Sequence, residues 1–521
     1  MALGKRAADG IVRGALLLTV AGFLVKIIGM IYKIPLTNRL GDDGMGYFNT
    51  AYTVYTFFFV LSSSGLPTAL ALSVAKDLGE GNEDAAYARF LGIRRFCTLL
   101  GISLSALLLL TAKLLSGLFG SRGAYLSLLA ISPALWFVTA ASVYRGYRQG
   151  RGDMLPSAIS QTVEALGKLT FGLLFLTLAG YYGFTKDKMA AYAILGLSVA
   201  AFLAYLFLAL FCREERRASR NFTEDVGGLT LDTLKTAMPI TLSSVAATLV
   251  TTLDLVLLMR ALVGAGYTYD AANAAWGNYS ALVLPLFHMP QILITPIAAA
   301  ALPVLRQKLA KGDTEGASRL AGGALLITAF VSALSALGLS LFSRDALLLI
   351  YTDPQSVARA YPKLALVAIA VFPFGITTVS AAFLQAKGRL WLPTVSLFIG
   401  AAVKLFATLF LVNTFGESVS AIGTLLSYTV SAAINFAALA KSTRLTLSRI
   451  LLLPFAVSTL SVGAGVLAKR YFDAVFTSSR VATLLAIGFS GILALGLLLL
   501  SGVGRSEGIR EIFKKDSTSV T

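Results

Sequence analysis

Charged residues are scarce in this chain. They make up 13% of its 521 residues, whereas hydrophobic residues make up 56%, and the mean hydropathy is +0.78. A soluble globular domain carries about 25% charged residues. The composition therefore indicates a polytopic membrane protein, and the apolar runs leave no stretch of useful size for a soluble domain.

Cysteine and histidine are also scarce, with two and one in the whole chain. Cys97 and Cys212 both fall near predicted cytoplasmic helix ends, so no disulfide framework is implied. The sequence has no His/Cys cluster with metal spacing, no phosphate-binding G-x-x-x-x-G-K-[ST] motif and no dinucleotide fingerprint. We therefore expect no cofactor, no bound nucleotide and no enzymatic chemistry. Any uphill work then depends on an ion gradient, with Na⁺ or H⁺ as the coupling cation, on the membrane potential or on consumption of a product.

The hydrophobic runs predict an all-α membrane protein with about fourteen transmembrane helices, since a helix needs about 20 residues to cross the hydrocarbon. The segment from Ala15 to Leu36 contains two lysines and leads into further spans, so we interpret it as a retained helix rather than a cleaved signal. The polar stretch from Arg213 to Lys235 is interpreted as a loop. The predicted spans are 11–36, 45–75, 92–116, 124–144, 156–183, 189–212, 236–262, 275–304, 320–343, 362–386, 391–414, 419–440, 450–469 and 481–503.

The distribution of basic residues predicts the orientation in the cell membrane. Of the 44 lysines and arginines, 28 lie in loops on the side of the termini, Arg94 and Arg145 among them, 12 lie in the opposite loops and four lysines are intramembrane. Cytoplasmic loops carry the excess of basic residues, so both termini are expected in the cytoplasm. The net charge of +18 then reflects topology and attraction to anionic lipids rather than nucleic-acid binding.

The chain repeats itself in part. Gln149, Gly152 and Lys168 recur as Gln385, Gly388 and Lys404, each at an offset of 236 residues. Two earlier landmarks also recur in order: the segments 45–49 and 276–280, each followed by a helix that contains a proline. The ordered matches predict two six-helix lobes in parallel repeat, 1–222 and 223–445, with the substrate site between the lobes. Residues 446–521 form two extra helices and a cytoplasmic tail.

Most charges inside the predicted spans are lysines: Lys26, Lys33, Lys168 and Lys404, against the acids Glu164 and Asp254. A charge in hydrocarbon is costly unless it pairs or faces water, so such residues are functional candidates. An excess of buried cations calls for an anion, so we predict a transporter for an anionic, lipid-linked substrate.

Helix 1 carries Gly22, Lys26, Gly29 and Lys33 at spacings of 4, 3 and 4 residues, which places them on one helical face. This stripe predicts a basic cavity wall. The alternative is that Lys33 lies near the outer end of the helix and extends to the headgroups.

Helix 5 carries a second polar stripe, Ser157, Gln161, Glu164 and Lys168. Glu164 precedes Lys168 by four residues, the favourable order for an intrahelical ion pair, so the two charges either neutralise each other or meet substrate. In helix 11, Lys404 shares a face with small and polar residues, and no acid lies within one turn of it in the sequence.

Two further residues are candidates for ion coupling or gating. Asp254 shares one side of helix 7 with Ser243, Ala247 and Thr251, and it either binds a coupling cation or proton or neutralises a lysine. His288 lies among the prolines of helix 8, where kinks are expected, and it is either a hydrogen-bonded structural residue or a proton relay.

Several motifs resemble one family. The loop Gly41-Asp42-Asp43-Gly44-Met45-Gly46-Tyr47, the Ser64-Gly65-Leu66-Pro67 turn, the fourteen spans and the repeat are similar to the multidrug/oligosaccharidyl-lipid/polysaccharide (MOP) exporter superfamily. Within it, they resemble the branch of stage V sporulation protein B, YtgP and the MurJ-type lipid II flippases. The resemblance covers essentially the whole chain.

The resemblance implies a flippase that moves a polyprenyl-pyrophosphate-linked sugar from the cytoplasmic to the outer leaflet by alternating access, for cell-wall, spore-cortex or polysaccharide biosynthesis. It implies a cationic cavity for the headgroup, to which we assign Lys26, Lys33, Lys168, Lys404, Glu164 and Asn49. It also implies a groove for the lipid tail at helices 13 and 14. MurJ-type proteins place arginines in helix 1, where this chain has lysines, so the headgroup can differ. The alternatives are an ion-coupled multidrug antiporter of the same superfamily, a passive lipid scramblase or a membrane scaffold.

Overall fold

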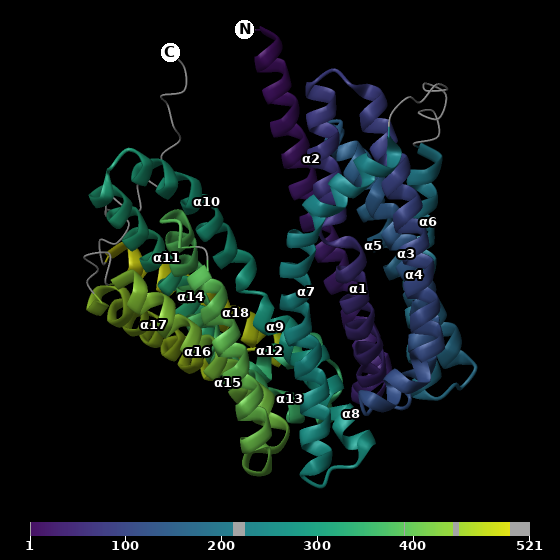
Figure 1. Cartoon of the computed structure of the whole chain (residues 1–521). Coiled ribbons are helices and arrows are strands. Elements are labelled where there is room, and N and C mark those ends of the chain that lie inside the picture. Colours follow the sequence, from purple (N-terminus) through teal and green to yellow (C-terminus); the bar gives the residue numbers. More distant parts are fainter. Residues whose placement is uncertain (1, 212–224, 390, 441–446, 501–521) are drawn as a thin grey trace. The chain divides into compact units, whose positions relative to one another are not determined.

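The protein is helical throughout the part of the chain that the structure describes (Figure 1). This computed structural model describes residues 2–211, 225–389, 391–440 and 447–500, and only the backbone at 2–16, 19, 243, 246, 247, 250, 251, 303 and 447–451. No strand occurs within those ranges, so the predicted all-α class is confirmed. Among the described residues, 11 helical segments are long and apolar enough to cross a membrane. The multi-pass membrane protein is thereby supported, while the number fourteen stays a prediction.

The chain divides into two compact units. Unit 1 comprises residues 1–263 and 267–277, and unit 2 comprises 264–266 and 278–521. The helices of unit 1 are α1 (Ala2–Ser63), α2 (Leu66–Gly79), α3 (Glu83–Leu118), α4 (Ala124–Gly150), α5 (Leu155–Tyr181), α6 (Lys186–Phe211), α7 (Val226–Gly264) and α8 (Tyr269–Asn278). Those of unit 2 are η2 (Tyr279–Val283), α9 (Leu284–His288), α10 (Gln291–Ala310), α11 (Thr314–Leu341), α12 (Ser343–Ile350), α13 (Pro354–Ile369), α14 (Val371–Ala386), α15 (Trp391–Phe415), η3 (Gly416–Ser418), α16 (Val419–Ala440), α17 (Leu447–Val475) and α18 (Ser479–Leu500). The division predicted at 222 and 445 stays a prediction.

Small residues let the helices of unit 1 approach closely. A Cβ on Gly196 of α6 would lie 2.3 Å from the backbone nitrogen of Gly172 on α5, so these two helices meet with backbone almost against backbone. Tyr32 of α1 packs over the same place, since a Cβ on Gly172 would lie 2.8 Å from its ring. In lipid, where hydrophobic association is weak, such contacts supply the van der Waals attraction between helices.

The first two predicted spans are joined by a kink rather than by a loop. α1 runs from Ala2 to Ser63, and Gly41 within it adopts φ 68° and ψ −174°, a conformation open almost only to glycine. The second predicted span, 45–75, is itself broken at Ser64 and Gly65, and α2 begins at Leu66 with a proline in its first turn. The chain therefore changes direction at Gly41, within α1.

The predicted loop from Arg213 to Lys235 is wrong in its second half, because α7 begins at Val226. The buried Arg89 of α3 explains why this polar segment is ordered. Its guanidinium donates to Asp77 on α2 at 2.7 Å and to Asp232 on α7 at 2.7 Å. It also donates to the carbonyl of Leu229 at 3.1 Å. These bonds connect the start of α7 to α3, and Arg89 also connects α3 to α2.

Two predicted single helices are broken. The span predicted at 275–304 is divided into α8, η2, α9 and α10, with α9 ending at His288 and α10 beginning at Gln291. The expected distortion by the prolines is therefore confirmed. The span predicted at 362–386 is the end of α13 and all of α14, which meet at Ala370.

Gly152 and Gly388, which match in the predicted repeat, have the same backbone geometry, but Gly81, Gly120, Gly183 and Gly312 form the same turn, so the repeat stays a prediction. Gly152 after α4 and Gly388 after α14 have the same φ of 79°. Each N–H of these glycines donates to the carbonyl three residues earlier, that of Gln149 at 2.9 Å and that of Gln385 at 3.1 Å. Since a positive φ costs glycine little, α4 and α14 end with the same turn.

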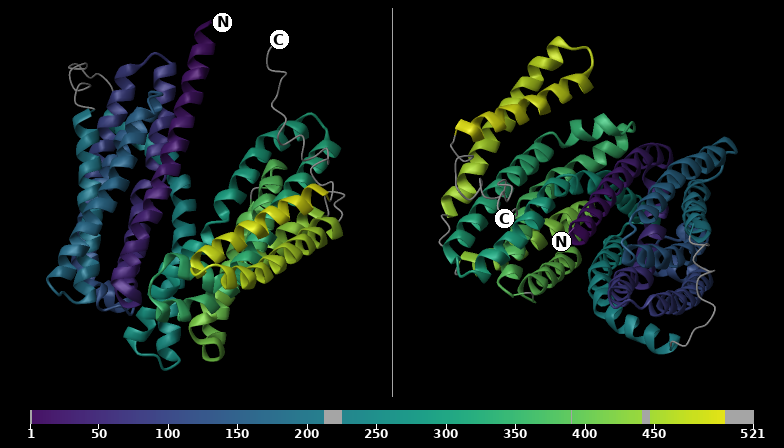
Figure 2. Two further views of the ribbon diagram at one scale, coloured as in Figure 1. Left: turned by 180° about the vertical axis from the view of Figure 1, so that it is seen from behind. Right: turned by 90° about the horizontal axis from the view of Figure 1, so that it is seen from above.

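The last two helices form a pair at the edge of unit 2. Figure 2 shows α17 and α18 side by side in both views. They pack on α11 through small apolar groups, one made of Phe330, Val457 and Ala494 and another of Phe342, Val462 and Ala486.

Candidate functional site

A cavity of about 510 Å³ lies inside unit 1, among α1, α4, α5 and α6. Its wall combines aromatic and aliphatic side chains with three basic groups and one carboxylate. The lining residues are Val25, Gly29, Tyr32, Lys33, Leu36, Phe48, Asn49, Tyr52, Arg145, Gln161, Glu164, Ala165, Lys168 and Leu197.

Both halves of α1 contribute to this wall because the chain turns at Gly41. Gly29 and Lys33 come from the first half, and Asn49 and Tyr52 come from the second. Lys33 is half-buried and Asn49 is buried. One helix therefore presents a cation and an amide to the same space.

The charged centre of the cavity is a three-residue cluster of α4 and α5, Arg145, Glu164 and Lys168. Glu164 accepts from Arg145 Nη2 at 3.0 Å and from Lys168 Nζ at 2.7 Å. Arg145 Nε also donates to Ser160 Oγ at 2.9 Å. The carboxylate holds both cations in fixed positions, and the side chains of Arg145 and Glu164 are each only 13% exposed.

The cavity has an excess of positive charge. Glu164 offsets one of its three cations, and Lys33 lies on the same wall. The bonds of Arg145 to Ser160 and Glu164 use two of the five N–H groups of its guanidinium. An anion that enters the cavity would thus meet fixed donors from α1, α4 and α5.

Four of the predicted cavity residues come together here: Lys33, Asn49, Glu164 and Lys168. The predicted intrahelical pair of Glu164 and Lys168 is present. Lys26 is exposed and is not among the lining residues, although it lies two turns from Lys33 on α1. The polar stripes of the sequence thus contain Lys33, Glu164 and Lys168, which line this cavity. Lys26 shares the stripe of α1 with Lys33 but lies outside the lining.

The remaining candidates lie elsewhere. Lys404 is half-buried on α15, where its stem packs against Gly423 of α16. Asp254 is buried on α7, and His288 is exposed at the end of α9. The side chains of Ser243, Ala247 and Thr251, predicted to share a face with Asp254, lie outside the described residues, as does Cys212. Cys97 is a buried free thiol. Nowhere in the described ranges do three His, Cys, Asp or Glu residues gather as metal ligands.

Arg145 is the cavity residue that the sequence analysis missed. The sequence predicts Arg145 in a cytoplasmic loop. In the structure α4 continues to Gly150, and Arg145 bonds the polar stripe of α5. The available signal was helical register, because Gln149 lies one turn after Arg145 and also bonds that stripe, at Ser157 Oγ.

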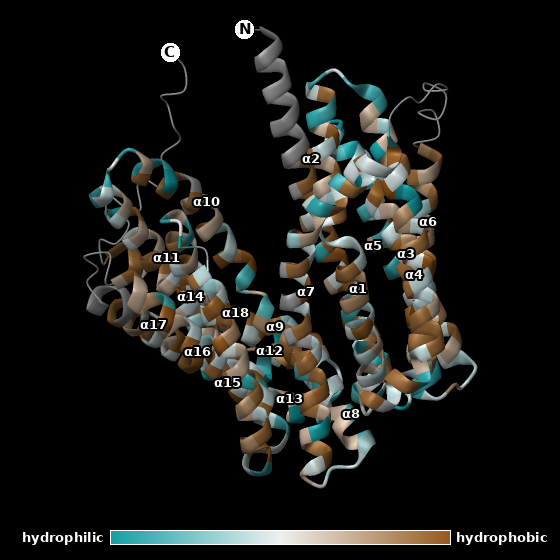
Figure 3. Cartoon of the chain, viewed as in Figure 1, coloured by the Kyte–Doolittle hydropathy of each residue, from teal (hydrophilic) through white to brown (hydrophobic). Residues whose placement is uncertain are grey.

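Hydropathy separates this polar interior from the outer surface. Figure 3 shows hydrophobic residues along the long helices of each unit and hydrophilic residues at their ends. Exposed leucines such as Leu110 on α3 and Leu499 on α18 agree with a lipid-facing surface. The charged cavity thus belongs to a protein whose exterior suits a bilayer.

Two family models match the chain. The model described as polysaccharide biosynthesis protein matches residues 11–308, and the model described as MatE matches 280–410. Among curated relatives from Bacillus subtilis (strain 168), stage V sporulation protein B is 25% identical over 303 residues, which cover 57% of this chain and 58% of that protein. Lipid II flippase MurJ is 23% identical over 450 residues, covering 82% of each.

Solved structures show the same fold. An inward closed lipid II flippase MurJ aligns with a TM-score of 0.68 at 15% identity, covering 96% of this chain and 100% of that one. An inward-facing MATE family multidrug resistance transporter of the MOP superfamily aligns with a TM-score of 0.62 at 15% identity, covering 80% and 95%. Superfamily resemblance predicted from the motifs is confirmed.

Proposed function

We propose, because the chain belongs to the polysaccharide biosynthesis protein family of the MOP exporter superfamily, that it is a membrane flippase for an anionic polyprenyl-pyrophosphate-linked sugar. The substrate moves from the cytoplasmic to the outer leaflet by alternating access. A lipid II-like or polysaccharide precursor fits this role in cell-wall, spore-cortex or polysaccharide biosynthesis. Both termini lie in the cytoplasm in this proposal, as the loop charges predict.

The observation that carries the proposal is the excess of fixed positive charge in a membrane-embedded cavity. Lys33, Arg145 and Lys168 face Glu164 alone within the lining. A pyrophosphate carries negative charge on several oxygens, and a guanidinium binds such groups in a bidentate way. Substrate binding would offset the cost of keeping these cations in an apolar protein.

Glu164 has a positioning role in this proposal. Its two ion pairs hold Arg145 and Lys168 in place while the cavity is empty. An arriving pyrophosphate then finds both cations already oriented, which lowers the entropy cost of binding. Asn49 and Gln161 can donate to the sugar or phosphate oxygens from the same wall.

The other parts of the chain take roles that match their composition. α17 and α18 offer exposed apolar surface for a polyprenyl tail, including Leu460 and Leu495. Lys404 supplies a cation of unit 2 that also meets the substrate in this proposal. Asp254 or His288 binds the coupling cation, Na⁺ or H⁺, if transport is driven by an ion gradient.

Reconstituted transport tests the proposal. Purified protein in proteoliposomes is given a fluorescent polyprenyl-pyrophosphoryl sugar in one leaflet, and its appearance in the other leaflet is followed with and without an Na⁺ or H⁺ gradient. We expect translocation well above that of protein-free liposomes. Arg145→Gln should reduce the rate at least roughly tenfold, the effect of losing one charge-assisted interaction of about 1.5–3 kcal/mol, whereas Arg145→Lys should retain part of it.

The MatE match supports a second candidate, an ion-coupled multidrug antiporter. The positive charge of the cavity would repel a cationic drug. This candidate therefore predicts drug efflux that Arg145→Gln does not reduce, and no movement of the anionic lipid. Equal movement of neutral and anionic lipids without any effect of Arg145→Gln would instead identify a passive scramblase.

A further inference from the structure

A second cavity lies at the opposite end of α3 from its start at Glu83, between the last turns of α3 and α7. Its volume is about 450 Å³, and the lining residues are Lys113, Leu114, Gly117, Leu118, Gly120, Met259, Arg260, Val263 and Tyr269. All of these belong to unit 1, and none lines the cavity of Lys33, Arg145 and Lys168. The loop charges predict that this end faces outward.

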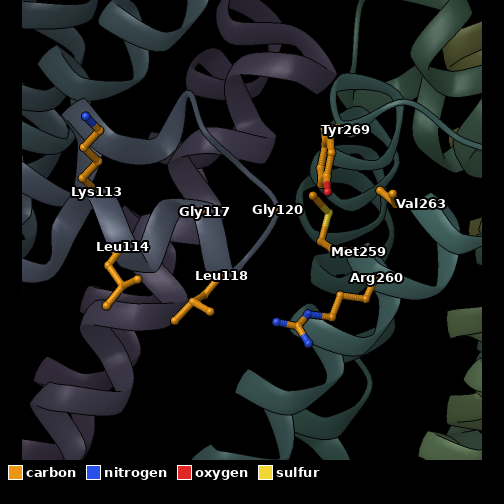
Figure 4. Close-up of a pocket in the computed structure, with 9 residues that line it drawn as sticks. All are labelled: Lys113, Leu114, Gly117, Leu118, Gly120, Met259, Arg260, Val263 and Tyr269. Atoms are coloured by element: carbon orange, nitrogen blue, oxygen red, sulfur yellow. The ribbon is translucent and has the colours of Figure 1, made fainter.

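The lining contains two cations and no carboxylate. Figure 4 shows the guanidinium of Arg260 extending from α7 toward Leu118 of α3, whereas the side chain of Lys113, also on α3, points away from Arg260. Among the described residues, neither the Lys113 nor the Arg260 side chain forms an ion pair with an acid. Only 12 loop basic residues are on the side predicted to be outer, and two of them line this one groove.

Exposed apolar side chains form a stripe along each of the two helices that carry these cations. On α3, Leu107, Leu110, Leu114 and Leu118 are exposed at spacings of 3, 4 and 4 residues, so they form one face. On α7, Leu249 and Leu253 are exposed and lie on the same face as Arg260, which follows Leu253 by seven residues. Both stripes run from the helix ends toward the middle of the span.

We propose that this groove binds an anionic phospholipid of the adjacent leaflet, with its phosphate at Arg260, the positive charge of Lys113 in the same lining, and an acyl chain along the leucines of α3. The arrangement is complementary to one molecule that carries a negative headgroup and a long apolar chain. Lys113 and Arg260 lie in the last two turns of α3 and α7, where headgroups are found. Leu107 and Leu110 of α3, like Leu249 and Leu253 of α7, lie deeper, where acyl chains are found. A zwitterionic lipid such as phosphatidylcholine also carries a phosphate, but its choline cation offsets that charge, so it would compensate the two basic residues less well.

Gly117 keeps the groove open. A Cβ at this position meets no atom within 4 Å, and the residue has an ordinary helical backbone in α3. Gly117→Leu therefore fills the groove without altering either cation. Gly338→Leu on α11 is the matched control, because a Cβ there also meets nothing within 4 Å and Gly338 is remote from the groove in sequence and unit.

Native mass spectrometry of the full-length protein tests the site, with phosphatidylglycerol and phosphatidylcholine of identical acyl chains as probes. We expect tighter binding of phosphatidylglycerol. Arg260→Gln and Lys113→Gln should each weaken it about fivefold, the factor given by about 1 kcal/mol per basic residue near a charged membrane surface. Lys188→Gln, which removes an exposed cation on the same predicted side, should leave it unchanged.

Gly117→Leu should weaken phosphatidylglycerol binding while Gly338→Leu does not. Added inorganic phosphate should not displace the lipid, because phosphate lacks the acyl chain. Equal binding of the two lipids, or unchanged binding after both Arg260→Gln and Lys113→Gln, overturns the proposal. Displacement by phosphate alone would overturn the lipid assignment. Should Gly117→Leu fail to fold, the two charge variants still decide the outcome.

Discussion

Lys33 and Lys26 occupy the same face of α1 but differ in surroundings. Lys33 lines the cavity of unit 1, and Lys26 is exposed. The sequence predicts that both bind substrate, but only Lys33 lies in the cavity wall. We expect Lys33→Ala to reduce transport of the anionic lipid at least roughly tenfold, as for loss of a charge-assisted contact of about 1.5–3 kcal/mol, and Lys26→Ala to reduce it less.

The measurement is translocation per folded protein in proteoliposomes. Lys33→Arg is the matched control, since it keeps the charge and changes only its shape. A larger loss with Lys26→Ala than with Lys33→Ala would show that Lys26, and not the described cavity wall, meets the substrate.

Glu164 connects two cations that would otherwise repel each other. We expect Glu164→Gln to lower the melting temperature in detergent, because Arg145 and Lys168 lose a shared partner at 3.0 and 2.7 Å. The cost should be on the order of 1–3 kcal/mol, since the side chains lie in a partly open cavity.

A different result would change the role of Glu164. If Glu164→Gln abolishes the response of transport to an ion gradient and leaves stability unchanged, the carboxylate takes part in coupling rather than in positioning.

Gly41 controls the first element of the fold. At its φ of 68° and ψ of −174°, a Cβ would meet no neighbouring atom within 4 Å, so the cost of a side chain there is entirely backbone strain. We expect Gly41→Ala to destabilise the protein by about 1–3 kcal/mol, because the two halves of α1 must keep their turn. Gly338→Ala in α11 has equal space and a helical backbone, so it should be neutral or slightly stabilising. Thermal unfolding of both variants in one detergent compares them, and equal melting temperatures would contradict the strain argument.

Asp353 determines where α13 begins. Its carboxylate accepts from Ser356 Oγ at 2.6 Å and from the N–H groups of Gln355 at 3.1 Å and Ser356 at 3.2 Å. The hydrogen bond from the Ser356 hydroxyl and, to a smaller extent, those from the two N–H groups lower the pKa of Asp353 below its ordinary value. The charged cap therefore stabilises the fold above the unfolded-state pKa, and this stabilisation is lost as pH falls through the native pKa.

We expect Asp353→Ala to cost about 1 kcal/mol at neutral pH, as for other helix caps. The difference in melting temperature from the wild type should narrow as the medium is acidified below the native pKa. Asp353→Asn keeps a capping oxygen without the charge and should show a smaller loss at neutral pH. A gap between wild type and Asp353→Ala that widens in acid would refute the assigned sign.

At the scale of the whole molecule, the orientation in the membrane follows from the segregation of basic residues. Lys311 and Gln355 are exposed in unit 2, Lys311 just before α11 and Gln355 in the first turn of α13. In a background without Cys97 and Cys212, we expect Gln355→Cys to react with a membrane-impermeant thiol reagent in intact cells and Lys311→Cys to react only after lysis. The reverse pattern would place the termini outside.

Local and compositional properties could be predicted from the sequence alone. Membrane class, all-helical structure and the Gly152 and Gly388 turns depend on hydropathy and on the conformational freedom of glycine. The pair of Glu164 and Lys168 depends on helical periodicity, since residues four apart share a face in any α-helix. These features need no knowledge of which helices are neighbours.

Other features depended on packing between distant segments. Arg145 joins the cavity because α4 lies against α5, and Asp232 is ordered because Arg89 of α3 lies beside it. The junction of α13 and α14 at Ala370 sets where the helices turn within one predicted span. Lys26 and Lys33 share one face by sequence, yet the cavity is enclosed by several helices and reaches only the second. Periodicity places a side chain on a helix face, but which neighbour covers that face is decided by tertiary contacts between residues far apart in the chain.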